Sequence, residues 1–216
     1  MSSFKPKSHW WIKGGYAIIY ALESINKELD MANLAQEHPI YKLAAEISHN
    51  DEEILKDISA CICETKKYFK EHREYEWRGM ENFDDYEESE VRWIGMVDVL
   101  FEGNYVYECD YKYKEELEDF LIQLGGLNGS FYILERRNGR RYNTLPLEED
   151  WFDEEGDIST WCAIIDEKWA EYQMCVGGID IDSDSYVMFP CALDSLAKLQ
   201  KYAEQSGYSI DYARNL

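Results

Sequence analysis

The clearest secondary-structure signals in the chain lie in the segment 173–212, QMCVGGIDIDSDSYVMFPCALDSLAKLQKYAEQSGYSIDY. The composition of its first part, 173–179, predicts a strand with two glycines inside it. Residues 182–185, Asp-Ser-Asp-Ser, are typical of a turn, because Asp and Ser side chains hydrogen-bond to their own backbone. Residues 186–189 predict a second strand, which we expect Pro190 to end.

The remainder of this segment predicts a helix and a last strand. Leu196, Leu199 and Ala203 fall on one helical face, and Gly207 is placed to end the helix. Residues 208–212 have the aromatic and β-branched content of a strand. Two strands joined by a short turn, then a helix and a further strand, are typical of an α+β fold with short antiparallel strands.

From residue 81 to this segment, predicted helices alternate with predicted strands. We expect helices near 91–101, 117–124 and 158–172, and strands near 105–109 and 131–134. The apolar residues that share the helical faces are Val91, Ile94, Val97 and Phe101; Leu117, Phe120, Leu121 and Leu124; and Ile158, Trp161, Cys162, Ile165 and Trp169. These helices would pack on the short strands.

The first eighty residues predict a helical layer. Pro39 suits the first turn of the second of three helices, and Asn50 or Asp51 suits the start of the third. The apolar stripes with a 3.6-residue period are Ile18, Leu22, Ile25 and Leu29; Ile40, Leu43, Ala44 and Ile47; and Ile54, Ile58, Cys61, Ile62 and Phe69. We expect a helical region over 1–80 and an acidic α+β domain over 81–216, as two units or as one continuous domain.

Net charge distinguishes the same two regions. The chain has 22 Lys and Arg against 44 Asp and Glu, a formal net charge of −22. Residues 1–80 hold 11 of these cations and 13 of the acids, a net of −2, and residues 81–216 hold 11 and 31, a net of −20. A surface of this sign repels nucleic acid and anionic membranes and attracts basic proteins or cations, although solubility alone also explains it. We therefore expect a basic protein as the partner, with no nucleic acid and no membrane.

Cysteine use and hydropathy both favour the cytoplasm. The six cysteines are scattered, with no CxxC pair and no Cys/His ladder, so we expect reduced and mostly buried thiols. No run approaches the ~18 apolar residues of a membrane span, and the N-terminal segment lacks the apolar core of a secretory signal. We expect a cytoplasmic protein without a cofactor.

Three aspartates at alternate positions form the sharpest local feature. On an extended segment Asp180, Asp182 and Asp184 share one face, where oxygen ligands can hold a hard cation. Their spacing matches the first half of a calcium-binding loop, but Ser185 stands where that loop needs Gly and Cys191 where it needs Glu. We expect a hydrogen-bonded turn and no metal, with a metal-dependent hydrolase or metal-regulated protein as the alternative.

Two further groups are candidates for binding a partner. Trp151 and Phe152 lie in an acidic stretch, where they dock on a basic surface or else pin the loop to the core. Arg137 and Arg140 flank a predicted tight turn, where they bind a phosphate or acidic partner or else pair with the chain's own acids. No nucleophile elbow, HExxH motif or phosphate-binding loop occurs in the sequence, so we expect no catalytic activity.

Two segments resemble an uncharacterised bacterial family, a domain of unknown function. They are 92–124, with EGNYVYECDYKYKEELEDFL, and 169–190, with WAE and VGGIDIDSDSYVMF. The resemblance implies a common fold and supplies no activity. A more distant likeness, carried by the Gly-then-Asp-rich turn before an aromatic strand, is to acidic α+β immunity proteins, which neutralise toxin domains.

Together these features favour a non-catalytic protein-binding module that meets a basic partner through its acidic surface, in the manner of an immunity protein or inhibitor. A DNA mimic, which presents the same acidity to a nucleic-acid enzyme, is a further alternative. The residues expected at the partner-binding surface are Asp180, Asp182, Asp184, Trp151, Phe152, Arg137 and Arg140.

Overall fold

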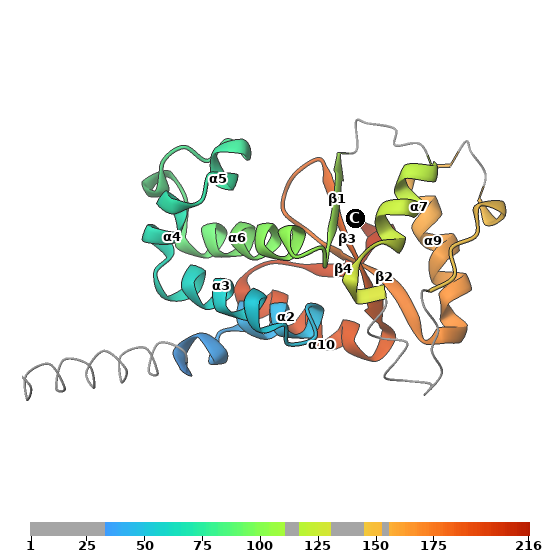
Figure 1. Ribbon diagram of the computed structural model, residues 1–216, viewed down its shortest axis with the longest axis horizontal. Coiled ribbons are helices and arrows are strands. Elements are labelled where there is room, and N and C mark those ends of the chain that lie inside the picture. Colours follow the sequence, from blue (N-terminus) through green and yellow to red (C-terminus); the bar gives the residue numbers. More distant parts are fainter. Residues whose placement is uncertain (1–32, 111–116, 131–144, 153–155) are drawn as a thin grey trace, which may run out of the picture.

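The computed structural model describes residues 33–110, 117–130, 145–152 and 156–216. They form an α+β fold around a four-stranded antiparallel sheet with the strand order β1-β3-β2-β4 (Figure 1). The strands are β1 (Tyr107–Asp110), β2 (Met174–Ile179), β3 (Ser185–Ala192) and β4 (Ile210–Tyr212). The predicted fold class is thereby confirmed.

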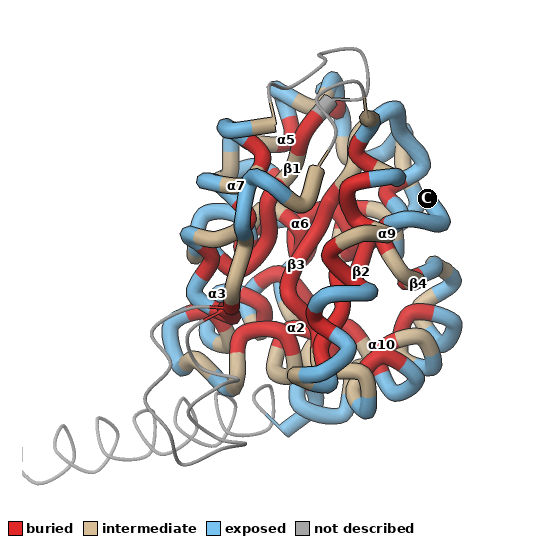
Figure 2. Tube along the Cα trace, turned by 90° about the vertical axis from the view of Figure 1, so that its right-hand side faces the viewer, coloured by how far each residue is buried: buried red, intermediate tan, exposed pale blue. Residues whose placement is uncertain are grey.

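Helices cover both faces of this sheet (Figure 1). On one side α10 packs on α2 and β4, and α3 packs on α6; on the other side α9 packs on β2 and α7 on β3. The helices are α2 (Pro39–Ile47), α3 (Glu52–Cys63), α4 (Thr65–Glu71), α5 (Glu74–Trp77), α6 (Glu88–Glu102), α7 (Leu117–Gly125), α9 (Ile158–Trp169) and α10 (Leu193–Ser206). Every residue of β2 is buried, because the strand has helices on both of its faces (Figure 2).

The strand side chains alternate between two core clusters. Val176 and Met188 join the cluster beneath α7 and α9. Ile179, Val187 and Phe189 join the cluster on the opposite face, with α2, α6 and α10. This alternation is the period of two expected of a strand, and it explains why the central strands are apolar at successive positions.

The first described helices agree with the predicted apolar stripes except at one residue. Pro39 occupies the first turn of α2, and the Asp51 side chain caps α3 by accepting hydrogen bonds from two backbone N–H groups. The expectation that Phe69 continues the stripe of the third helix is wrong, because α3 ends at Cys63 and Phe69 lies on α4. The backbone leaves the helical region at Glu64, where φ is −129°.

Helix α6 connects the two regions that the charge distinguishes. Val91, Ile94 and Val97 lie on its buried face as predicted, but Phe101 is 49% exposed, so its expected place on that face is wrong. Leu100 is buried instead. Phe101 follows it and is rotated by about 100° around the helix axis, which turns its side chain away from the core. Since α6 packs on α3 and α4, residues from both sides of position 80 share one core cluster.

The β2–β3 hairpin forms as predicted, with one correction at its end. The expectation that Pro190 ends the strand is wrong, since β3 continues to Ala192 and pairs Pro190 with Val176. Among the described residues, the pairing of β3 with β1 stops at Met188. Since the described part of β1 does not reach Pro190, the missing N–H of the proline interrupts no pairing between β1 and β3.

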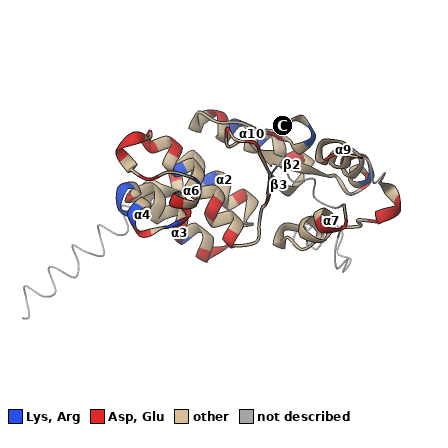
Figure 3. Cartoon of the chain, turned by 90° about the horizontal axis from the view of Figure 1, so that it is seen from above, with Lys and Arg blue, Asp and Glu red and all other residues tan. Residues whose placement is uncertain are grey.

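Charged residues are unevenly placed over this fold. Lys66, Lys67 and Lys70 gather on α4, and acidic residues lie at both ends of the long axis (Figure 3). Within the described ranges, no helix has the length and apolar character needed to cross a membrane. The predicted helix with Ile18 and Leu29 and the predicted strand at 131–134 lie outside those ranges.

Candidate functional site

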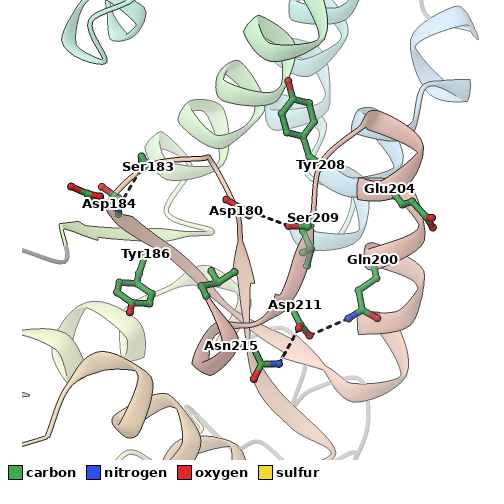
Figure 4. A pocket seen from close by; sticks show the side chains of 13 residues that line it. Asp180, Ser183, Asp184, Tyr186, Gln200, Glu204, Tyr208, Ser209, Asp211 and Asn215 are labelled. Carbon is green, nitrogen blue, oxygen red and sulfur yellow. Dashed lines mark hydrogen bonds between the residues drawn. The ribbon is translucent and has the colours of Figure 1, made fainter.

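A pocket of about 650 Å³ opens at the edge of the sheet beside the β2–β3 turn (Figure 4). Three parts of the chain form it: the turn, the C-terminal half of α10, and β4 with the residues that flank it. The lining residues that carry its chemistry are Asp180, Asp184, Tyr186, Glu204, Tyr208 and Asp211.

Asp180, the residue after β2, is held in place by four hydrogen bonds. Its backbone N–H donates to the Ser209 carbonyl (3.1 Å), and its carbonyl oxygen accepts from Nε1–H of Trp93 (2.8 Å). Its carboxylate accepts from the backbone N–H of Asp182 (2.9 Å) and from the Ser209 hydroxyl (3.0 Å). The carboxylate is therefore oriented before any ligand arrives, which reduces the entropy lost on binding.

Trp93 belongs to α6, yet it positions two sides of this pocket. Its side chain is fully buried, and its ring stacks on Tyr208 with centroids 4.6 Å apart and planes 9° apart. The same ring donates the hydrogen bond to Asp180. Burial raises the pKa of Tyr208, which keeps the phenol neutral at physiological pH. One buried side chain therefore sets the separation of Asp180 and Tyr208.

Asp211 lies on the edge strand β4, where it pairs in register with Gly178 of β2. Its Oδ1 accepts hydrogen bonds from the Gln200 side chain (3.2 Å) and the Tyr212 backbone N–H (2.8 Å). Its Oδ2 accepts from the Asn215 side chain (2.9 Å). All three donors are neutral, so they fix the carboxylate without cancelling its negative charge.

The pocket is acidic and partly aromatic. Four of its lining residues carry carboxyl groups, and the lining contains no Lys, Arg or His among the residues that the structure describes. Tyr186 and Tyr208 contribute aromatic rings, whose faces attract cations. Carboxylates beside aromatic rings suit a guanidinium or ammonium group.

The three aspartates of the turn are not brought together on one face. Asp180 and Asp184 line the pocket, whereas Asp182 is exposed, has a left-handed backbone (φ 54°) and is not part of the lining. In the described part of the chain, no group of three or more His, Cys, Asp or Glu side chains is arranged to hold a metal ion. Within the turn, the Asp182 N–H donates to the Asp180 carboxylate and the Ser185 N–H donates to the Ser183 hydroxyl oxygen.

The other predicted site residues do not line the pocket. Trp151 and Phe152 are half-buried. Phe152 packs against the core cluster beneath α7 and α9, and the Lys168 amine lies 5.5 Å from the centroid of the Trp151 ring. Phe152 therefore anchors its segment to the core. Arg137 and Arg140 lie outside the described residues.

The structure joins Asp180 and Asp184 with acidic residues that no sequence motif singles out. Glu204 is one polar position on a predicted helix, and Asp211 is one polar position on a predicted strand. Tyr208 could be predicted only as the start of that strand. The pairing of β2 with β4 brings these separate segments together, and nothing local in the sequence encodes that pairing.

The fold and the pocket define the chain as an acidic α+β protein with a carboxylate-lined cleft at the edge of its sheet. Residues 39–213 match a known family, Domain of unknown function (DUF6630), and the chain belongs to that family. The predicted resemblance to a domain of unknown function is thereby confirmed. No curated protein and no solved structure matches the chain.

Proposed function

We propose that this chain is a non-catalytic protein-binding module whose acidic pocket receives a Lys or Arg side chain of a basic partner. The observation that supports the proposal is the lining of the pocket, to which Asp180, Asp184, Glu204 and Asp211 contribute carboxyl groups and the described residues contribute no cation. The formal net charge of −22 adds a long-range attraction for a basic protein.

The size and composition of the pocket suit a long cationic side chain. Its volume of about 650 Å³ falls in the range of roughly 300–1,000 Å³ found for small-ligand sites. A guanidinium group forms paired hydrogen bonds with carboxylates, and its aliphatic stem packs on apolar and aromatic surface. Because Trp93 fixes Asp180 and Tyr208, the pocket is largely formed before the partner binds.

The specific form that we favour is an inhibitor of a basic protein in the cytoplasm. None of the six cysteines, all within the described ranges, forms a disulfide, which suits a reducing compartment. Complementary charge accelerates association and disfavours wrong partners, and an inhibitor needs both properties.

The proposal is tested by titrating the protein into a fluorescent peptide of alternating Gly and Arg and measuring anisotropy. The test variant combines Asp180→Asn, Asp184→Asn and Glu204→Gln, which remove three charges with little change of shape. We expect the variant to bind about 3- to 150-fold more weakly, because each exposed charge pair contributes roughly 0.2–1 kcal/mol and 1.4 kcal/mol is tenfold. A peptide with Gln in place of Arg should bind far more weakly to the wild-type protein.

A matched control variant removes the same charge elsewhere. Glu118, Asp119 and Glu167 are exposed on α7 and α9 and do not line the pocket. Their combined replacement by Gln, Asn and Gln should change the affinity less than threefold at near-physiological salt, where distant charges are screened. Equal losses in the two triple variants, or equal binding of the Arg and Gln peptides, would refute the pocket as the recognition site.

A further inference from the structure

Two of the six cysteines face each other across the central strands. Cys175 on β2 and Cys191 on β3 are partners in the antiparallel register. Directly opposed residues in such a pair have Cα atoms about 4.5 or 5.5 Å apart, and both values fall within the roughly 4.4–6.8 Å that a disulfide spans. The strands therefore hold the two residues within reach of a disulfide without any change of fold.

Both side chains lie on the same face of the sheet, because both residues belong to the core cluster formed with α2, α6 and α10. Both side chains are buried, and both residues are free cysteines. The Cys175 thiol, which shares a hydrogen bond with Cys191, and burial together raise the pKa of Cys191 above its usual range. A small thiolate fraction makes oxidation slow at neutral pH and faster in alkaline buffer.

A second pocket has Cys191 among its lining residues. It has a volume of about 220 Å³ and is lined by Cys191 together with residues at the end of α2 and the start of α10, among them Glu46 and Ser195. Since one water molecule occupies about 30 Å³ in the liquid, this space is large enough for a peroxide. Cys175 lies deeper, so Cys191 is the thiol that meets the oxidant first.

We propose that Cys175 and Cys191 form a reversible redox modification site, which hydrogen peroxide converts to a cross-strand disulfide. The Cys191 sulfur attacks one peroxide oxygen, the O–O bond breaks, and the displaced hydroxide leaves as water with the thiol proton. The resulting sulfenic acid is attacked by the Cys175 sulfur, the S–O bond breaks, and a second water leaves with the Cys175 proton. Two thiols and one peroxide thus give one disulfide and two waters, and a thiol reductant reverses the change. This site is independent of the acidic pocket.

The test oxidises the whole chain and then digests it with trypsin, which leaves both cysteines in one peptide. Residues 169–198 follow Lys168, end at Lys198 and contain no other Lys or Arg. The protein is treated with millimolar hydrogen peroxide at mildly alkaline pH, unfolded with N-ethylmaleimide, digested without reduction and analysed by mass spectrometry. We expect most of this peptide to carry no maleimide and to be lighter than the dithiol by two hydrogens. After dithiothreitol the same peptide should take up two maleimides.

Two single variants provide the controls. Cys63→Ser removes the half-buried thiol of α3 and should leave the disulfide unchanged, whereas Cys191→Ser should abolish it. The wild-type digest alone can overturn the proposal, even if the second variant fails to fold. The overturning results are an unoxidised 169–198 peptide, separate oxidation of its two cysteines, or a disulfide that joins Cys109 to Cys162 in its place.

Discussion

Replacing Trp93 by Phe should destabilise the fold far more than the same change at Trp77. The Trp93 side chain is fully buried, stacks on Tyr208 and donates a 2.8 Å hydrogen bond to the Asp180 carbonyl. Losing that hydrogen bond costs about 0.5–1.5 kcal/mol. The cavity left by the smaller ring adds roughly 1–3 kcal/mol, so we expect a total loss of about 2–4 kcal/mol in the free energy of unfolding.

Urea denaturation followed by far-ultraviolet circular dichroism measures this loss without relying on tryptophan fluorescence. Trp77 is 81% exposed, so Trp77→Phe should change the stability by less than about 0.5 kcal/mol. The Trp93 variant should also bind the Arg peptide more weakly, because Asp180 loses one of its supports. A Trp93→Phe variant as stable as Trp77→Phe would show that Trp93 does not position the pocket.

Three further predictions concern the strands, the buried carboxyl and metal ions. Gly177→Ala should cost about 1–3 kcal/mol in thermal unfolding, because its Cβ would lie 2.6 Å from Cζ of the buried Phe189 ring. Burial raises the pKa of Asp166 to about 6, so as pH falls the Asp166 carboxylate is protonated in the folded state before it is protonated in the unfolded state. The stability of the wild-type protein relative to Asp166→Asn should therefore rise as pH falls through about 6. A difference in melting temperature between the two proteins that does not change with pH would contradict this. Adding millimolar Ca²⁺, Mg²⁺ or Mn²⁺ should leave the melting temperature unchanged, and a rise of several degrees would support the metal-dependent alternative.

The sequence predicts those helices and strands that are encoded by short local patterns, such as an apolar stripe or a glycine that ends a helix. The apolar stripe of α10 and the left-handed Gly207 that ends it agree with the predicted helix. Pro190 does not end β3, although a proline is expected to end a central strand, because the described part of β1 pairs with β3 only as far as Met188. The stripe of Val91, Ile94 and Val97 does not determine whether Leu100 or Phe101 continues the buried face, and in the structure Leu100 is the buried residue.

The pocket could not be predicted because its parts meet only through long-range contacts. Trp93 and Asp180 are 87 positions apart in the sequence, and their hydrogen bond depends on how α6 packs beside the sheet. Asp211 reaches the pocket because β4 pairs with β2, and Glu204 reaches it because α10 packs on β4. The sequence did identify the turn that forms one wall, since alternating Asp and Ser residues predict a turn by their own chemistry.

Mapping the bound peptide on the protein distinguishes recognition by the pocket from attraction to the whole acidic surface. Backbone amide shifts of ¹⁵N-labelled protein should be recorded during titration with the Arg peptide and with the Gln peptide. We expect the largest shifts for the Arg peptide at residues that line the pocket, such as Ser183, Ser185, Ser209 and Asn215. Shifts concentrated around Glu118 and Glu167, or spread evenly over the acidic surface, would contradict recognition by the pocket.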